Sequence, residues 1–291
     1  MSSVYLGCPL WAHAPWRGAF FTRGARREEF LPQYASVFPT AEGNATFYGL
    51  PTETTVERWA AEAPEGFRFC FKFPRTISHE RQLEGAGEDT AQFLARVAPL
   101  GGRLGPFFLQ LHERFGVERI RTLERYLDSL PAGCRCAVEV RAPEFFAGGP
   151  AERRLDDLLT SRRVDRVLFD TAGLFAVKAQ DEATRDAQRK KPRVPRRETT
   201  TALAPFVRFV GDPVIEANDA ALQRWAKVAR RWCDEGRTPF IFLHHPDDLH
   251  APALARRFQH WLHVEDPTRF APPPRWAAEG ESEPERQLSL F

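Results

Sequence analysis

The amino-acid sequence predicts a single α/β barrel of the TIM type, (β/α)8, followed by a disordered C-terminal tail. Eight short apolar segments alternate with helical patterns, and 291 residues is a common length for one such barrel. Several segments are apolar on one face and polar on the other, with the polar groups toward their C-terminal ends, where the active sites of these barrels lie. We expect the barrel to span 1–266, with a charged insertion at 178–205, and the tail to span 267–291.

Three segments show the clearest strand patterns. In EGNATFY at 42–48, Glu42 and Asn44 begin a polar face that continues along the segment. In FRFCFKFP at 67–74, four phenylalanines occupy one face, and an arginine, a cysteine and a lysine occupy the other. In CAVEVR at 136–141, two valines lie opposite a glutamate and an arginine. These patterns are typical of strands that are apolar toward the outer helices and polar toward the barrel mouth.

The other elements follow from length and periodicity. Further strands are expected at 4–8, 105–111, 167–171, 206–211 and 239–245, and helices at 26–38, 88–100, 117–130 and 151–162. Another helix should begin with Thr54 as its N-cap, since Glu57 three residues later completes a capping box. Apolar stripes at 222–233 and 254–262 predict the last two helices. Strands that alternate with helical crossovers run parallel, and eight of them favour a closed barrel over an open sheet.

The composition excludes several classes of protein. The formal net charge of +2 is too small for a polycation, so any contact with nucleic acid must be local. No apolar run could cross a membrane, and MSSVYLGCP enters a strand almost at once, so we expect no signal peptide, no membrane partner and a cytoplasmic location. The five cysteines indicate buried reduced thiols. Cys134 and Cys136 could bind a metal or cycle redox, but no second cysteine pair completes such a site.

The strand ends of the predicted barrel bring charged and polar side chains to one rim. The candidates for catalysis are Glu42, Lys72, Glu139 and Asp170. The candidates for ligand binding are Asn44, His79, Gln110, Arg141, Arg208, His244 and His245. Carboxylates that face cations shift each other's pKa values, as acid–base chemistry requires. The rigid donors of the lysine and the two arginines suit a phosphate or carboxylate group.

Other interpretations of this rim stay open. Buried Glu–Arg and Asp–Arg pairs in barrels are often structural, and Glu139 with Arg141 could be such a pair. The carboxylates and histidines of the rim are competent metal ligands, but no HxH or HExxH spacing is present and the nearby cations would repel a metal ion, so we expect none. No GxSxG elbow indicates a nucleophile, and no GxGxxG or GxxxxGK[ST] loop indicates a nucleotide. The sequence implies no cofactor.

Several motifs occur in the order found in one known family. They are E-x-N-x-T-F-Y-x-L-P at 42–51, GFRFCFKFPRTISHE at 66–80, LGPFFLQL at 104–111, AVEVR at 137–141, VRFVG at 207–211 and HAP at 250–252. Over most of its length, 4–263, the chain resembles the YecE-like family, domain of unknown function 72. The resemblance implies a TIM-type barrel with a polar pocket at the strand ends, and it implies no reaction. His244 and His245 stand where members often have two asparagines, and Gly43 stands where an apolar residue is frequent.

The insertion after the sixth strand is rich in basic residues and should lie on the same face as the pocket. The candidates for nucleic-acid contact are Lys190, Lys191, Arg193, Arg196 and Arg197. A flexible basic loop could clamp a polyphosphate or a nucleic-acid backbone. No aromatic residues interleave these side chains, which favours the alternative of a solvated loop, or of a loop whose arginines pair with pocket carboxylates.

The last five residues of the sequence follow an acidic, proline-bearing stretch. They read QLSLF and resemble the pentapeptide by which bacterial replication and repair proteins dock on the DNA polymerase sliding clamp. Gln287 would supply an amide, and Leu288, Leu290 and Phe291 would fill apolar pockets on a tether that orders when bound. The alternative is a tail whose apolar end folds back on the barrel.

These features predict a barrel protein that binds or processes a phosphate-bearing or other anionic ligand. In this hypothesis it is an accessory of DNA replication or repair, tethered to the sliding clamp, and the ligand is nucleic acid or a phosphorylated small molecule. One alternative is a small-molecule enzyme that uses carboxylate acid–base chemistry on an anionic substrate. Another is a non-catalytic binding module.

Overall fold

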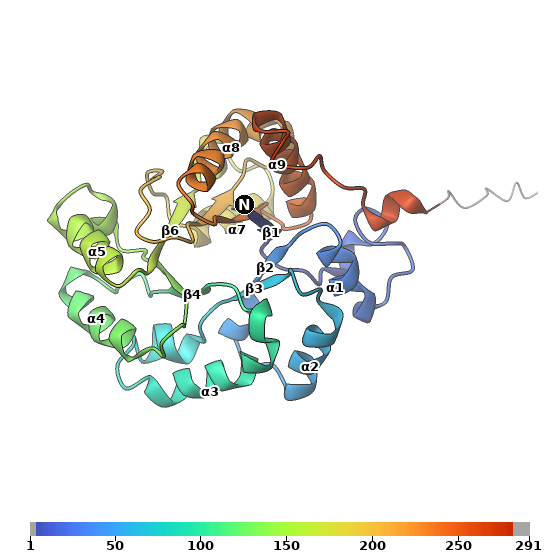
Figure 1. Cartoon of the computed structure of the whole chain (residues 1–291). Helices are drawn as coiled ribbons and strands as arrows, with labels where there is room; N and C mark the ends of the chain where they lie inside the picture. The colour runs from blue at the N-terminus through green and yellow to red at the C-terminus, as the bar shows by residue number, and fades with distance from the viewer. Residues whose placement is uncertain (1–3, 282–291) are drawn as a thin grey trace, which may run out of the picture.

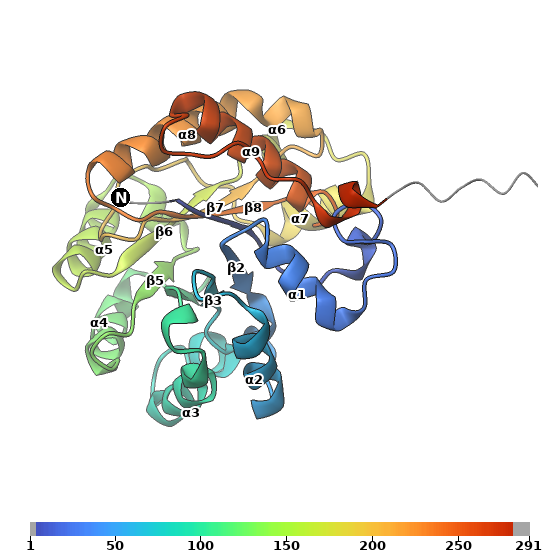
Figure 2. The same cartoon turned by 45° about the vertical axis from the view of Figure 1, so that its right-hand side comes forward.

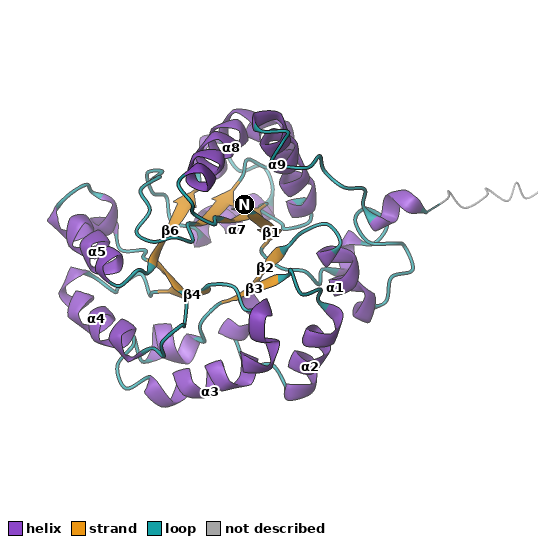
Figure 3. Ribbon diagram, in the orientation of Figure 1, coloured by secondary structure: helices purple, strands orange, loops and turns teal. Residues whose placement is uncertain are grey.

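Eight parallel strands form a ring surrounded by helices in the computed structural model, which describes residues 4–281 (Figures 1 and 3). The strands are β1 (Tyr5–Cys8), β2 (Thr40–Gly43), β3 (Arg68–Phe71), β4 (Phe107–Gln110), β5 (Cys136–Glu139), β6 (Asp165–Asp170), β7 (Phe206–Val210) and β8 (Phe240–His244). They pair in the order β3-β2-β1-β8-β7-β6-β5-β4. A bridge between Lys72 and Phe108 brings β3 to β4 and almost closes the ring. The predicted fold class is therefore confirmed.

The helices lie outside the ring and follow the strands along the chain (Figure 2). They are α1 (Arg27–Ala35), α2 (Glu53–Glu62), α3 (Gly87–Val97), α4 (Ile120–Ser129), α5 (Pro150–Ser161), α6 (Ala172–Ala176), α7 (Glu182–Lys190), α8 (Asp219–Asp234) and α9 (Ala251–Glu265). The N-cap of α2 is Thr52 rather than the predicted Thr54, because the Thr52 side chain accepts a hydrogen bond from the backbone N–H of Thr55. The apolar stripe of α8 is buried as predicted.

Side chains from opposite strands meet inside the barrel. The ring centroid of Phe206 in β7 lies 5.5 Å from that of Phe108 in β4 and 4.9 Å from that of Phe242 in β8. Because β4 and β7 are not neighbours in the sheet, Phe108 and Phe206 contact each other through the interior. With Cys70 and Ala137 these rings form an apolar layer. This layer is the floor beneath the polar residues at the strand ends.

The outer face of β3 confirms the predicted alternation. The four phenylalanines at 67, 69, 71 and 73 are fully buried. Trp59 of α2 stacks on Phe71 with ring centroids 5.6 Å apart, so this face packs against the helices. The opposite face carries Cys70 into the barrel interior and Lys72 to the mouth.

The predicted strand at 42–48 is correct only as far as Gly43. Residues Asn44–Phe47 form a 3-10 helix, η2, instead. The hydroxyl of Thr46 lies 2.8 Å from the carbonyl oxygen of Gly43 and 2.6 Å from that of Lys72, which closes a tight turn. The alternation of side chains therefore stops here, and Tyr48 is 83% exposed.

Gly43 itself is required by a close approach to the next strand. A Cβ atom at this position would lie 2.2 Å from Cδ1 of Phe71, far inside contact distance. The absence of a side chain lets β2 end against the phenylalanine and turn directly into η2.

The charged insertion at 178–205 contains a helix that the sequence pattern did not reveal. Asp181 caps α7 by accepting a hydrogen bond from the backbone N–H of Thr184 at 2.7 Å. Only Thr184 and Ala187 of α7 are buried, so no long apolar stripe marks it in the sequence. The insertion places the end of α7 beside the barrel mouth.

The chain stays packed on the barrel beyond the predicted boundary at 267. Phe270 is buried, and the ring of Trp276 lies 5.3 Å from that of Phe20. A short 3-10 helix, η8, follows at Ala277–Gly280. Two aromatic anchors therefore hold residues 267–281, which were predicted to belong to the tail, on the barrel despite their proline-rich composition. The pentapeptide at 287–291 lies outside the described residues.

Candidate functional site

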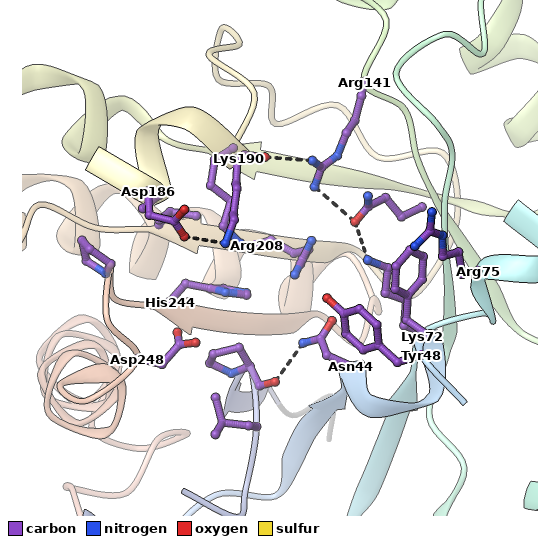
Figure 4. Close-up of a pocket in the computed structure, with 18 of the residues that line it drawn as sticks. Asn44, Tyr48, Lys72, Arg75, Arg141, Asp186, Lys190, Arg208, His244 and Asp248 are labelled. Atoms are coloured by element: carbon purple, nitrogen blue, oxygen red, sulfur yellow. Dashed lines mark hydrogen bonds and ion pairs between the residues drawn. The ribbon is translucent and has the colours of Figure 1, made fainter. Parts of the chain in front are cut away.

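A cavity of about 700 Å³ opens at the carboxyl ends of the strands (Figure 4). Most of the predicted rim residues line it, namely Asn44, Lys72, His79, Gln110, Arg141, Arg208, His244 and His245. Glu42 and Glu139 are fully buried and contact the lining residues from beneath. Strand ends at one face of the barrel thus bring these side chains together, as expected for this architecture.

Arg208 joins the two carboxylates beneath the cavity. Its Nε and Nη2 donate to Oε1 and Oε2 of Glu42 at 2.7 and 2.9 Å, and its Nη1 donates to Oε2 of Glu139 at 2.6 Å. The guanidinium carbon lies 5.0 Å from the ring centroid of Phe108 and 5.3 Å from that of Phe169. Arg208 therefore rests on the apolar floor and holds three strands in one hydrogen-bonded network.

Both buried carboxylates stay ionised. Burial by itself raises the pKa of Glu139, but Arg208 and Arg141 outweigh this effect and lower it to about 2. Burial also opposes the charge of Glu42, yet Arg208 and His244 hold its pKa well below the ordinary value. A carboxylate that is bound to arginine and screened from the cavity is a weak general base. The geometry suits both residues to positioning cations better than to the predicted catalytic role.

Gln110 connects the next two cations of the site. Its Oε1 accepts from Nζ of Lys72 at 2.7 Å and from Nη2 of Arg141 at 3.1 Å. Arg141 also donates from Nε to Oε1 of Glu139 at 2.8 Å and from Nη1 to the carbonyl oxygen of Lys190 at 3.0 Å. Arg141 therefore has a carboxylate partner. Lys72 forms no ion pair within residues 4–281.

The amine of Lys72 lies in a desolvated position. Its Nζ is 3.9 Å from the ring centroid of Phe47, and the residue is 8% exposed. Burial lowers the pKa of this amine, and Arg208 and Arg141 lower it further, although Glu139 opposes them. The resulting pKa of about 7 makes Lys72 a cation that can lose its charge near neutral pH.

Lys191 and Asp248 face the same cavity from loops. Burial lowers the pKa of Lys191 to about 8, with Arg208 adding to the effect. Burial raises the pKa of Asp248 to about 6, although Lys191 opposes it. Asp248 was not predicted, because it lies in a turn after β8 with a positive φ of 58° rather than on a strand. Its only signal in the sequence is the HHPDD run that follows the last strand.

His244 and Asn44 complete the surroundings of Glu42. Nε2 of His244 lies 3.1 Å from Oε1 of Glu42, and Nδ2 of Asn44 donates to Oε2 at 2.9 Å and to the carbonyl oxygen of Pro9 at 2.8 Å. Burial lowers the pKa of His244 to about 4 despite the neighbouring carboxylate. This histidine is therefore neutral at pH 7.

His245 is held by the loops that follow β7 and β8. Its Nδ1 lies 2.6 Å from Oδ1 of Asp247, and its Nε2 lies 3.1 Å from the carbonyl oxygen of Pro213. Both ring nitrogens are therefore occupied by the protein. His245 lines the cavity, but its polar atoms bind loop residues, which indicates a role in fixing these loops.

His79 lies on the opposite wall, in a short π-helical turn, η3 (Thr76–Glu80). Its ring centroid is 4.9 Å from that of Phe47 and 5.4 Å from that of His112, a lining residue that the sequence pattern did not single out. Burial lowers the pKa of His79 to about 4, and the charge of Lys72 adds to the effect. His79 is therefore neutral at pH 7 and adds an aromatic surface to this wall of the cavity.

Asp170 does not join the site. Its Oδ2 accepts a hydrogen bond at 2.8 Å from Nε1 of Trp225 in α8, and its Oδ1 accepts from the backbone N–H of Ala172 at 3.1 Å. The preceding residue, Phe169, lies under Arg208 inside the barrel. Because side chains alternate along a strand, Asp170 points outward to the helices. The prediction that Asp170 lies at the rim is therefore wrong.

The basic segment divides into residues that face the cavity and residues that do not. Lys190 and Lys191 line the cavity. Lys190 also pairs with Asp186 at 2.6 Å. The other three contact groups within the chain: Glu198 for Arg196 (3.3 Å), Glu152 for Arg197 (2.9 Å) and the Phe175 ring for Arg193 (5.7 Å). Arg196 and Arg197 thus pair with carboxylates, as the alternative interpretation expected, but not with those of the pocket.

Two kinds of feature are absent from the described residues, 4–281. No cluster of three or more histidine, cysteine, aspartate or glutamate side chains in this range has a geometry that could hold a metal ion. No helix in the same range has both the length and the hydropathy needed to cross a membrane. The five cysteines are free thiols.

The family model described as a protein of unknown function, DUF72, matches residues 5–278. The chain belongs to the DUF72 family. It is similar to UPF0759 protein YecE of Escherichia coli, with 41% identity over 251 residues, which cover 86% of this chain and 89% of the relative. The YecE protein of a second Escherichia coli strain is 40% identical over the same shares of both chains.

Solved structures of two DUF72 proteins share the fold. The protein from Enterococcus faecalis superposes with a TM-score of 0.68 at 19% identity, over 90% of this chain and 96% of that one. The protein from Thermotoga maritima gives a TM-score of 0.67 at 20% identity, over 90% of this chain and 99% of that one. At these identities the structures support the barrel architecture of the DUF72 chain and nothing about its ligand.

Proposed function

We propose that this DUF72 protein binds an anionic small molecule, carrying a phosphate or carboxylate group, in the cavity at the barrel mouth. The main support is that Lys72 and Lys191 both line the cavity while neither forms an ion pair with any carboxylate in the described range 4–281. The nearby acids Glu42 and Glu139 are already bound to arginines. An entering anion would supply the missing partner.

The other lining cations are less available. Arg75 pairs with Glu80 at 3.5 Å, and Arg141 is bound through Glu139 and Gln110. They would contribute to the positive field without giving up their partners. A cavity of about 700 Å³ has the volume of a site for a single metabolite-sized ligand.

Anion binding can be measured by calorimetry with inorganic phosphate and with sulfate. Replacing Lys191 with Met removes one of the two unpaired amines, so we expect affinity for both anions to fall by about tenfold or more. The matched control is Lys227→Met, which removes an exposed lysine of α8 that does not line the cavity and should leave affinity unchanged. Equal affinities for all three proteins would contradict the proposal.

An acid–base enzyme acting on an anionic substrate is the second candidate function. Asp248 favours it, because a carboxyl with a pKa of about 6 on the cavity wall can exchange a proton near neutral pH. Mass spectrometry of whatever the denatured protein releases from the cavity would separate the candidates. A released compound that the fresh protein converts to a product supports the enzyme, and one that returns unchanged supports a binding module.

We also propose that the pentapeptide at 287–291 docks the barrel on the bacterial sliding clamp, as an accessory of DNA replication or repair in the cytoplasm. The support is the sequence of the pentapeptide alone. Docking would raise the local concentration of the barrel at DNA without a DNA-binding face of its own. This fits the self-paired arginines of the basic segment.

Surface plasmon resonance with an immobilised sliding clamp tests the docking. The full chain should bind, and a chain that ends at Arg286 should lose binding. Replacing Leu288 and Phe291 with alanine should act like the truncation, whereas Glu285→Ala should not. Undiminished binding by the truncated chain would exclude this role for the pentapeptide.

A further inference from the structure

Lys72 is anchored more firmly than a surface lysine. Its backbone N–H donates to the carbonyl oxygen of Gly43 at 3.1 Å, and its own carbonyl oxygen lies 2.6 Å from the hydroxyl of Thr46. The backbone of Lys72 is therefore fixed by hydrogen bonds to Gly43 and Thr46, and its side chain extends into the cavity (Figure 4). A reactive group benefits from such a rigid support.

The amine at the end of this side chain has an unusual set of neighbours. Within the described residues its single hydrogen-bond partner is Oε1 of Gln110 at 2.7 Å, and the ring of Phe47 covers it at 3.9 Å. Neither neighbour carries a negative charge. Lys190, in contrast, pairs with Asp186 at 2.6 Å.

The charges that face Lys72 come from several elements. Glu42 of β2 and Glu139 of β5 favour the ammonium form, and Arg208 of β7 and Arg141 after β5 oppose it. Burial is the largest effect, and it lowers the pKa to about 7. A large fraction of the amine is therefore neutral near pH 7, which is the state in which nitrogen attacks carbon.

We propose that Lys72 is a nucleophile that forms an imine with an aldehyde or ketone carrying an anionic group. This inference rests on the proposed anion binding, with Lys191 holding the anionic group. The nitrogen lone pair attacks the carbonyl carbon, the carbonyl electrons move to oxygen, and a proton passes from nitrogen to that oxygen. Addition of a second proton from solvent releases water as the C=N bond forms, and the positive charge remains on the iminium. No oxidant or reductant is needed.

Pyridoxal 5′-phosphate is a suitable probe because it joins an aldehyde to a phosphate. The full chain is incubated with it at pH 7.5, reduced with sodium borohydride, and mapped by peptide mass spectrometry. The chain has five lysines, at 72, 178, 190, 191 and 227, so the assignment is unambiguous. Because its lowered pKa leaves more of its amine neutral, we expect Lys72 to be modified on the order of a hundredfold faster than the exposed Lys178 and Lys227.

Two variants test whether the labelling depends on the amine of Lys72 rather than on the overall fold. Lys72→Met and Lys72→Arg should both lose the labelled peptide, and the arginine variant keeps the positive charge. Their thermal unfolding and their labelling at Lys178 should match the wild type. Labelling in proportion to exposure, or labelling that concentrates on Lys191, would overturn the role of Lys72.

A second compound separates this inference from anion binding itself. Pyridoxamine 5′-phosphate carries the phosphate without the aldehyde. If pyridoxamine 5′-phosphate binds, but pyridoxal 5′-phosphate leaves no imine trapped at Lys72, the role of Lys72 as a nucleophile is excluded and the anion site is retained. If pyridoxal without a phosphate labels Lys72 as well as pyridoxal 5′-phosphate does, and pyridoxamine 5′-phosphate does not bind, Lys72 is a nucleophile and the proposed anion site is excluded.

Discussion

Arg208 binds Glu42 through two parallel hydrogen bonds, from Nε to Oε1 at 2.7 Å and from Nη2 to Oε2 at 2.9 Å. The two residues belong to β7 and β2, and β1 and β8 lie between these strands in the sheet. The third nitrogen of the same guanidinium binds Glu139 of β5. One arginine thus braces three separate strands across the barrel interior, directly under the cavity.

Replacing Arg208 with Met tests this brace. The variant leaves Glu42 and Glu139 buried with fewer cations, and breaking a buried ion pair from one side destabilises a protein by about 3–5 kcal/mol. Urea unfolding should show this loss. Arg26→Met is the control, because its ion pair with Glu29 is exposed to solvent and should contribute little to stability. If Arg208→Met lowered the free energy of unfolding as little as Arg26→Met, the network around Arg208 would not stabilise the barrel.

His244 should make stability depend on pH. Its pKa is about 4 in the folded protein, below the ordinary value of 6.5, because burial disfavours the imidazolium. The unfolded chain therefore binds this proton at higher pH than the folded chain. Stability from the neutral ring is complete above pH 6.5 and is lost as the pH falls toward 4, by about 2–3 kcal/mol.

Urea unfolding between pH 4.5 and 7.5 measures this effect. His244→Asn cannot take up a proton, so its stability should fall less over this range than that of the wild type. The exposed His260 gives a matched control, and His260→Asn should keep the slope of the wild type. Parallel profiles for wild type and His244→Asn would contradict the assigned effect.

The sequence predicted the barrel and most of the rim for a simple physical reason. In β3 and β5 polar residues alternate with apolar ones, so the side chain on each face can be identified from a period of two. β6 reads VLFD at its end and is buried on both faces, so no alternation reveals which way Asp170 points. The face predicted for Asp170 is therefore wrong.

Other features depended on contacts that no local pattern encodes. The turn at Asn44–Phe47 depends on Thr46, whose hydroxyl reaches the carbonyl of Lys72 on the next strand. Asp248 enters the cavity from a loop after β8, and only the three-dimensional course of that loop places it beside Lys191. The strand patterns thus identified most rim residues, but not Asp248, which only the folded loop brings to the cavity.

Asp170 should behave as a structural residue. Asp170→Ala leaves Nε1 of Trp225 buried without its acceptor, which destabilises by about 1–3 kcal/mol. Adding Trp225→Phe removes the unsatisfied donor, so the double variant should lose less than the sum of the two single variants. Anion affinity should match that of the wild type throughout. If Asp170→Ala lowered anion affinity without lowering stability, Asp170 would belong to the binding site after all.

The pH dependence of sulfate binding gives a direct test of the charges in the cavity. Sulfate keeps both charges between pH 5.5 and 9, so any change belongs to the protein. As the pH rises, Asp248 gains a negative charge near pH 6, and Lys72 and Lys191 lose positive charges near pH 7 and 8. All three changes disfavour an anion, so the dissociation constant should rise by about tenfold or more from pH 5.5 to 9.

Calorimetry should show a smaller rise for Asp248→Asn, confined to pH above 6, and an unchanged profile for Lys227→Met. A flat profile for the wild type would mean that sulfate binds elsewhere.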